Sequence, residues 1–448
     1  MGSLHPTRSR LVLALAAGLA AQCNCPGPGK LPPWDGGTDG VPADAGRDAP
    51  AARDAGRDAG PVTWIALPGL SERCGMMAVE PAAVHPPLSF EPCPDRPACR
   101  QLVADWEPND NGYRVSASSL SGYHDGERGH FVMGRPDPMS EVRHWSIVAT
   151  DGGEIILVVR MPNLDTVGSG CLFAETVIGE GHYAMRVLMP DRSERIFGGE
   201  LTAPAATLRE VARYDPRAYG DGWISYLRVG AEQMAFNTTS YRGYRVGWDG
   251  SIRRIDRADG TWVDTNHPSV AGSAIVFDDE QARNHILVSE AGGPPVDLVP
   301  PPAPGAEPSV HYRTDGRTLA WLTGFDRIGG GPFYYERVEL WASPFAARAE
   351  ELSPVRLAVM RNPGVHAAVL GGWGHAAVID DDAAVIRFFR VSDGHETELR
   401  APEGTTWDGF VSFIGPREVM VSAGDMLAYR SGHSAVMFID HTALEPPL

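Results

Sequence analysis

Two stretches with one pattern decide the fold: Tyr244–Ile255 reads YRVGWDGSIRRI, and Phe388–Leu399 reads FFRVSDGHETEL. In each, a strand-forming run leads into an Asp-Gly pair and then into a second such run. Asp-Gly between two such runs is a strong signal for a tight β-hairpin, because glycine tolerates the positive φ of the turn. Both stretches therefore predict hairpins. His285–Leu298 and, more weakly, Arg186–Phe197 follow the same pattern.

A second pattern alternates with these hairpins: a glycine followed by a short apolar run. Its members are Gly129–Met133, Gly181–Met185, Gly222–Leu227, Gly272–Phe277, Gly374–Ile379 and Gly409–Ile414, with Thr318–Thr323 in the one gap. We interpret them as inner strands that alternate with outer hairpins at roughly 35 to 57 residues, a spacing typical of β-propeller blades. The sequence from Val62 onward has room for seven blades, or eight, at about 50 residues each. We therefore predict an all-β fold, a single propeller over residues 62–448.

A family resemblance supports this prediction. Thr314–Trp321 (TDGRTLAW) resembles the DGRxLAF-type repeat of TolB-like propellers, which are related in shape to WD-repeat propellers. Thr150–Leu157 (TDGGEIIL) is a degenerate second copy. In that repeat the Asp-Gly pair forms a turn and the apolar residues form blade core, so the resemblance implies architecture and no catalytic residue.

The N-terminus resembles an export signal. Arg8 and Arg10 precede the uncharged apolar run Leu11–Ala21, which is too short to span a membrane. The cysteine that follows, Cys23, resembles the lipidated cysteine of the bacterial lipoprotein box. We expect lipid attachment at Cys23; attachment at Cys25, or simple secretion after a cut at Ala21, is the alternative.

Residues 1–25 therefore form the predicted signal segment, and residues 26–61 form a linker. The linker contains DAGRDA at Asp44–Ala49 and DAGRDAG at Asp54–Gly60, with almost no large apolar residue. Such a composition cannot offset the entropy of ordering, so we expect disorder. A lipid followed by a flexible spacer would hold the propeller at the bacterial envelope, on the outer membrane or cell surface.

Charge and cysteines narrow the possible partners. A formal net charge of −18 argues against a nucleic-acid partner, whose phosphates favour a basic surface. Four cysteines lie beyond the signal, and an even count in an exported chain indicates disulfides. Cys93 and Cys99 enclose a short Pro-containing loop and are predicted to pair, which leaves Cys74 to pair with Cys171. The spacing of the first pair does not suit zinc.

No motif identifies a reaction. Val167–Cys171 (VGSGC) fails the spacing of a nucleophile elbow. Asp380–Asp382 and Asp278–Glu280 could offer oxygen ligands to Ca²⁺, but an exposed turn explains them better. Glu107–Gly112 begins like a calcium loop, yet Ser118 stands where its last carboxylate belongs. We therefore assign no catalytic, cofactor-binding or metal-binding residue.

Two repeated residue types remain. His130, His182 and His375 each follow a glycine at a strand start, and we expect them to pack or cap rather than to line the axis. Tryptophans recur along the repeats and are interpreted as blade packing: Trp223, Trp248, Trp262, Trp321, Trp341, Trp373 and Trp407. The predicted function is non-enzymatic binding of a protein, peptide or glycan. An enzyme with residues dispersed over several blades is the alternative, because a fold alone does not fix function.

Overall fold

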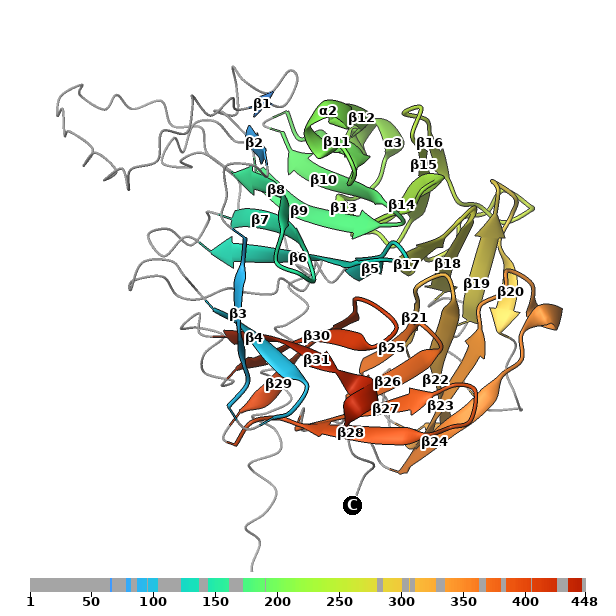
Figure 1. Ribbon diagram of the computed structural model, residues 1–448. Helices are drawn as coiled ribbons and strands as arrows, with labels where there is room; N and C mark the ends of the chain where they lie inside the picture. The colour runs from blue at the N-terminus through green and yellow to red at the C-terminus, as the bar shows by residue number, and fades with distance from the viewer. Residues whose placement is uncertain are drawn as a thin grey trace, which may run out of the picture. The chain divides into compact units, whose positions relative to one another are not determined.

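Seven antiparallel β-sheets follow one another along the chain in a computed structural model (Figure 1). The structure describes residues 65–66, 78–81, 87–94, 96–103, 122–136, 144–160, 172–189, 191–279, 285–299, 306, 311–327, 335–361, 368–379, 384–403, 405–424 and 434–444. All of them belong to one compact unit, Ala59–Leu448.

The first strand of each sheet contacts the first strand of the next, and the last of these contacts the first again. This closed circle makes each sheet a blade, and it confirms seven blades rather than eight. The inner strands are β5 (Gly122–His124), β9 (Leu172–Gly179), β13 (Ile224–Val229), β17 (Asn266–Ala271), β21 (Tyr312–Thr314), β25 (Ala368–Gly372) and β29 (Thr406–Phe413).

The remaining strands follow outward in chain order. Second strands are β6 (Gly129–Pro136), β10 (His182–Leu188), β14 (Gln233–Thr238), β18 (Ala274–Asp279), β22 (Thr318–Arg327), β26 (His375–Ile379) and β30 (Glu418–Gly424). Third strands are β7 (His144–Thr150), β11 (Glu194–Glu200), β15 (Gly243–Gly247), β19 (His285–Glu290), β23 (Tyr335–Pro344), β27 (Val385–Arg390) and β31 (Ser434–Asp440). Fourth strands of blades one to six are β8 (Ile155–Arg160), β12 (Arg209–Tyr214), β16 (Ile252–Arg254), β20 (Val296–Val299), β24 (Val355–Arg361) and β28 (Glu396–Arg400).

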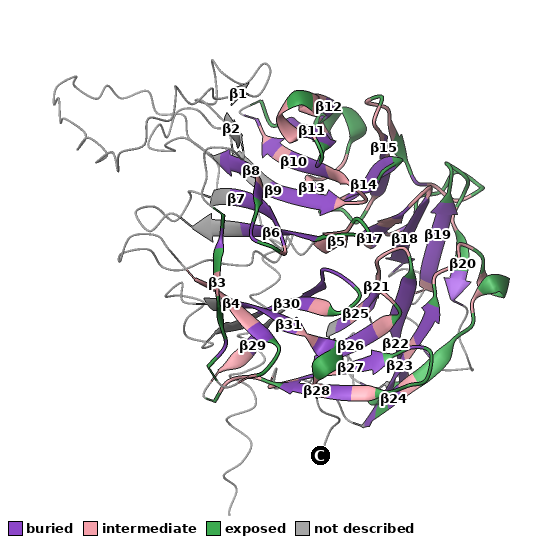
Figure 2. Ribbon diagram, viewed as in Figure 1, coloured by how far each residue is buried: buried purple, intermediate pink, exposed green. Residues whose placement is uncertain are grey.

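Seven apolar clusters fill the seven junctions between neighbouring blades. One cluster joins Val132 and Val148 of blade one to Tyr183 and Met185 of blade two, and the others repeat the arrangement around the circle. Blade seven packs on blade one in the same way, through Phe438 and its neighbours. The second and third strands are accordingly the most buried (Figure 2).

The glycine-led runs occupy a different place from the one we expected. Five of the seven runs, counting Thr318–Thr323, are second strands; only Gly222–Leu227 and Gly409–Ile414 include inner strands. The physical reason is burial: a second strand has neighbours on both edges and both faces, so it is the most continuously apolar strand. The hairpin predictions are confirmed, since Tyr244–Ile255 forms β15 and β16, and Phe388–Leu399 forms β27 and β28.

A hairpin from the start of the described chain completes the last blade. The strand β4 (Cys99–Val103) pairs with the C-terminal β31, and β3 (Ser89–Pro92) pairs with β4 (Figure 1, blue beside red). A disulfide joins Cys93 to Cys99 with a Cα–Cα distance of 5.4 Å, as predicted. Arg100 stabilises the packing of β4 in blade seven, because its guanidinium donates two hydrogen bonds to Glu418 at 3.0 and 2.8 Å. Blade seven thus combines strands from the N-terminal and C-terminal parts of the described chain.

Two short strands extend blade one in the same manner. Strand β2 (Ala78–Pro81) pairs with β8, and β1 (Ile65–Ala66) pairs with β2. Helices in the described residues are single turns: α2 (Pro204–Thr207), α3 (Pro216–Tyr219), η3 (Ala349–Glu351) and η4 (His441–Ala443). The all-β prediction is therefore confirmed. No helix among the described residues has the length and apolar character of a membrane span.

Candidate ligand-binding site at the axis

Four inner strands bring charged side chains together near the axis. We call Glu175 of β9, Arg228 of β13, His267 of β17 and Arg313 of β21 the axial cluster. They come from blades two, three, four and five, and they lie close enough to shift one another's pKa: Glu175 and Arg313 act on Arg228, and both arginines act on His267. Arg228, His267 and Arg313 remain partly accessible to solvent.

His267 occupies an unusual backbone conformation. Its φ is 43°, in the left-handed region that a non-glycine residue adopts only when its surroundings require it. The register of β17 against β18 shifts between Asn266 and Ser269, so His267 sits in a bulge, a device that re-aims a side chain. The hydroxyl of Tyr312 holds the bulge by donating to the His267 carbonyl at 2.6 Å. The imidazole packs on Tyr226 at 4.9 Å between ring centroids.

The two arginines have few protein partners. Arg228 donates through Nη1 to the carbonyl of Leu227 at 2.7 Å, and Arg313 donates to that of Tyr312 at 3.0 Å. Neither guanidinium lies within ion-pair distance of a carboxylate in the part of the chain that the structure describes. Burial lowers the pKa of Arg228 from its ordinary value, which marks incomplete compensation of its charge.

Burial and the neighbouring basic side chains determine the protonation state of His267. Burial lowers its pKa well below the ordinary value, and the charges of Arg313, His311 and Arg228 lower it further. The imidazole is therefore neutral at neutral pH. Its electrostatic surroundings are basic, whereas the whole chain carries a net charge of −18. An anion placed beside these groups would find two guanidiniums and a neutral imidazole as hydrogen-bonding partners.

Glu175 connects the axial cluster to a buried ion network. Its side chain is fully buried; Oε1 lies 3.3 Å from Nε of Arg186 and accepts a hydrogen bond from the N–H of Leu227 at 3.2 Å. Arg186 also pairs with Glu194 at 3.3 Å, so one guanidinium serves two carboxylates. Burial raises the pKa of Glu175, and it raises that of Glu194 to about 7. Oε2 of Glu175 has no hydrogen-bond partner.

On one face, turns between inner and second strands surround the axis, and Glu180 ties three blades together there. Its two oxygens accept from the N–H of Gly272 at 3.1 Å and of Ala231 at 2.9 Å. Its charge helps to raise the pKa of Tyr123 in blade one, after burial and Asp125. We call this the turn face.

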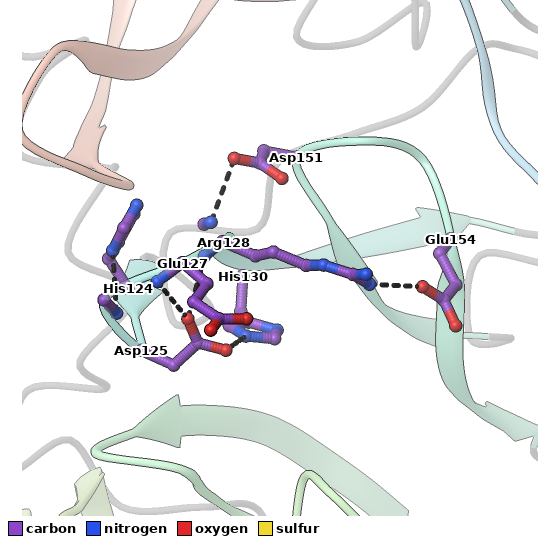
Figure 3. Close-up of polar contacts among 9 residues, drawn as sticks. His124, Asp125, Glu127, Arg128, His130, Asp151 and Glu154 are labelled. Carbon is purple, nitrogen blue, oxygen red and sulfur yellow. Dashed lines mark hydrogen bonds and ion pairs between the residues drawn. The ribbon is translucent and has the colours of Figure 1, made fainter.

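The three repeated histidines lie at these turns, outside the axial cluster. Figure 3 shows the first, where Oδ2 of Asp125 lies 3.0 Å from Nε2 of His130. The other oxygen of Asp125 accepts from the backbone N–H of Glu127 and Arg128 at 2.7 and 2.8 Å. Arg128 pairs with Glu154 of the same blade at 2.8 Å. These contacts fasten the turn of blade one.

The other two histidines cap their turns through the backbone. Nδ1 of His182 lies 3.0 Å from the Glu180 carbonyl, and Nδ1 of His375 lies 3.0 Å from the Trp373 carbonyl. His182 also packs on Trp248 of the next blade, at 4.8 Å between ring centroids. The expectation that these histidines cap strands and pack between blades is confirmed.

One acidic stretch requires a correction. Asp278 and Asp279 belong to β18 and are buried, so they do not form an exposed turn. Asp279 forms an ion pair with Arg257, which compensates its charge. Their side chains point to opposite faces, and both are buried because β18 lies between two strands and its blade packs between two neighbours. Among the described residues, no three His, Cys, Asp or Glu side chains are arranged to hold one metal ion.

Most tryptophans pack as expected, but one aromatic group is exposed. Trp321 and Trp407 are buried. Tyr219, Tyr241 and Trp262 are the exposed aromatic residues of the described chain, at 36% to 41%. All three belong to blade three and its flanking connections, at the ends of its strands away from the turn face.

Contacts hold these three residues in one patch. The guanidinium of Arg242 stacks over the Trp262 ring at 5.3 Å and donates to the Gly220 carbonyl at 3.5 Å, beside Tyr219. Tyr241 precedes Arg242 and has a left-handed φ of 60°. We call Tyr219, Tyr241, Arg242 and Trp262 the aromatic patch.

Several sequence-based predictions fall outside the described residues. They are the signal and lipid site (Cys23 or Cys25), the linker, Cys74 and Cys171, Glu107–Gly112, Val167–Cys171 and Asp380–Asp382. The axial cluster, by contrast, was missed. The only signal in the sequence is a lone arginine inside an otherwise apolar or aromatic run, as at Arg228 in ISYLRV.

Comparisons with known proteins show similarity in fold only. No model of a protein family matches the sequence, and no curated protein matches it. The chain is similar to oligogalacturonate lyase from Vibrio parahaemolyticus at 12% identity and a TM-score of 0.49, covering 81% of this chain and 98% of that one. It is similar to BamB from Moraxella catarrhalis at 12% identity and a TM-score of 0.37, covering 79% and 94%. It is also similar to YCF48 bound to a peptide, at 13% identity and a TM-score of 0.42, covering 80% and 97%. None of these likenesses identifies a function, which has to be argued from the site.

Proposed function

We propose that this chain is a non-enzymatic binding protein whose axial cluster holds a carboxylate of a protein or peptide partner. The carrying observation is the pair Arg228 and Arg313, two partly accessible guanidiniums without an ion-pair partner among the described residues. Guanidinium is the cationic group best shaped for carboxylate, because its fork of N–H donors matches the two oxygens. The strained backbone at His267 adds a neutral imidazole to the same place.

The aromatic patch supports a macromolecular partner. Tyrosine, tryptophan and arginine are the residues that dominate the energetics of protein–protein interfaces. Here all the exposed aromatic residues of the described chain gather on blade three, away from the turn face that Glu180 ties together. A partner that approaches from this side would contact the aromatic patch on blade three. We infer that its acidic side chain or C-terminus enters the axial cluster.

Carboxylate binding can be measured without knowing the partner. Citrate, and a tri-aspartate peptide compared with its tri-asparagine analogue, are suitable probes for isothermal titration. We expect the wild type to bind citrate and to prefer the aspartate peptide, and Arg228→Gln or Arg313→Gln to weaken binding by roughly tenfold or more. Arg253→Gln, an exposed arginine on β16, is the matched control. Equal affinity for the two peptides, or equal loss in the control, would contradict the proposal.

A second candidate function is an enzyme built on the same residues. It is favoured by the convergence of a neutral imidazole, a carboxyl group of raised pKa and two guanidiniums from four blades. The variant His267→Gln distinguishes the two functions. A binding protein retains most of its carboxylate affinity, whereas an enzyme loses turnover of any substrate found and keeps binding.

We further propose that Cys23 carries the lipid that holds the protein at the bacterial envelope. The support is the basic, apolar and cysteine order of Arg8 to Cys23, followed by the linker. A stable anchor requires more than one acyl chain, as the lipoprotein resemblance implies. Cys23→Ser should release the protein into the soluble fraction, while Cys25→Ser should not. If the N-terminus of the mature chain is Gln22, the signal is cut after Ala21 and the protein is secreted without a lipid.

A further inference from the structure

A pocket between blades six and seven presents two imidazoles that the function proposed above does not use. His375 at the start of β26 and His441 in η4 line this pocket, together with His395, Thr397 and Arg390. The centroids of the His375 and His441 rings lie 4.5 Å apart. Neither residue belongs to the axial cluster, so the pocket is a separate feature of the molecule.

Backbone carbonyls fix the tautomer of both rings. Nδ1 of His375 lies 3.0 Å from the carbonyl oxygen of Trp373, which can only accept, so Nδ1 carries the proton. His441 donates to the carbonyl of Pro416, and its buried Nε2 has no partner. The donating nitrogen of His441 is therefore also Nδ1. In each neutral ring Nε2 then bears the lone pair, and that of His441 is buried without a hydrogen-bond partner.

Packing and a hydrogen bond hold His441 in place. His441 stacks on Phe388 at 5.3 Å between centroids and 18° between planes, and the Thr397 hydroxyl donates to its carbonyl at 3.4 Å. Histidines that bind metals typically have this arrangement, with one ring N–H given to a carbonyl and the other nitrogen free.

We propose that Nε2 of His375 and Nε2 of His441 together bind a divalent transition-metal ion of the kind that prefers imidazole, with Zn²⁺ as the probe. Since no third protein ligand is arranged among the described residues, water completes the coordination. The charge of Arg390 does not prevent this, because its guanidinium pairs with Asp393 at 3.1 Å.

Zinc titration of the untagged, full-length protein tests the proposal. We expect calorimetry to show a site whose affinity falls about tenfold or more in His375→Gln and in His441→Gln, since each removes one ligand. The matched control is His285→Gln, whose imidazole pairs with Asp297 on blade four. Zinc binding that is absent from the wild type, or unchanged in both variants, would overturn the assignment.

Because His441 is buried, its replacement could unfold blade seven, so a second measurement uses the wild type alone. Nitrogen-15 spectra of the histidine rings should show that zinc shifts the Nε2 resonances of His375 and His441 and leaves that of His285 in place. Shifts confined to other histidines would place the ion elsewhere. Neither measurement depends on carboxylate binding at the axis, so the two proposals fail independently.

Discussion

Burial of charge determines the behaviour of individual residues at the junction of blades two and three. Glu194 is nearly inaccessible, and its pKa of about 7 follows mainly from burial, which outweighs the attraction of Arg186. One guanidinium cannot fully compensate two buried carboxylates. A proton on Glu194 therefore relieves the network, and the stability of the fold should depend on pH.

We predict that the contribution of Glu194 to the free energy of unfolding decreases as pH rises from about 5 to 8. The pKa of Glu194 is higher in the folded chain than the ordinary 4.5, so its stabilising contribution is complete below that value and is lost as pH rises through about 7. The loss is at most about 3 kcal/mol. In urea unfolding, the stability of the wild type should fall relative to that of Glu194→Gln over this pH range, whereas the exposed Glu350→Gln should keep the profile of the wild type. Identical profiles for Glu194→Gln and the wild type would contradict this.

His267 should report on ligand binding at the axis. Its pKa lies well below the ordinary value because of burial and three basic neighbours. A bound carboxylate would add a negative charge and favour the imidazolium, so we predict that saturating citrate raises the pKa of His267 by about one unit or more. NMR titration of the ring measures it, and His285 on blade four serves as reference. A pKa that stays unchanged at saturation would mean that the anion binds elsewhere.

The sequence reveals little at this scale because the axial residues come from four different blades. Glu175 and Arg313 are far apart in the chain, and neither lies in a recognisable motif. His267 is placed by a bulge that no sequence pattern announces. These side chains meet because the closed ring of blades brings the inner strands together around the axis. Their proximity can therefore be predicted only when the arrangement of the inner strands is known.

At the scale of elements, the Asp-Gly turns are the reliable signal. Gly250 has a φ of 87° between β15 and β16, as the hairpin prediction required. The position of a strand within its blade is harder to predict from sequence, since burial makes the second strand more apolar than the inner one. The pairing of β4 with β31 was also beyond sequence reasoning, because it joins residues more than 300 positions apart.

The disulfide should stabilise this closing hairpin. Cys93 and Cys99 constrain β3 and β4, and β4 is the strand that meets β31. We predict that Cys93→Ser with Cys99→Ser lowers the free energy of unfolding by about 2 kcal/mol, since the enclosed loop is short. Reductant should lower the melting temperature of the wild type more than that of the double variant, which keeps Cys74 and Cys171. If reductant destabilises both equally, another disulfide is responsible.

The whole molecule is a closed circle of seven equivalent junctions, and its stability depends on closure. Each apolar cluster takes residues from two adjacent blades, so a blade detached from one neighbour exposes a complete face. Closure itself rests on β3 and β4, which precede all of blade one's own four strands in the chain and pair with the C-terminal β31 in blade seven. The predicted linker precedes these strands in the sequence, so we expect the two kinds of truncation to behave differently.

We predict that a chain lacking residues 1–61 unfolds at the same temperature as the full-length protein, whereas a chain lacking residues 1–104 is strongly destabilised. The longer deletion removes β1 and β2 from blade one and β3 and β4 from blade seven. It leaves the edge of β31 unpaired and deletes the ion pair of Arg100 with Glu418. An open strand edge also favours association between chains. Calorimetry and light scattering measure the two effects. Equal melting temperatures for the two truncations would show that blade seven is stable without its N-terminal strands, and that the remaining junctions hold the ring together.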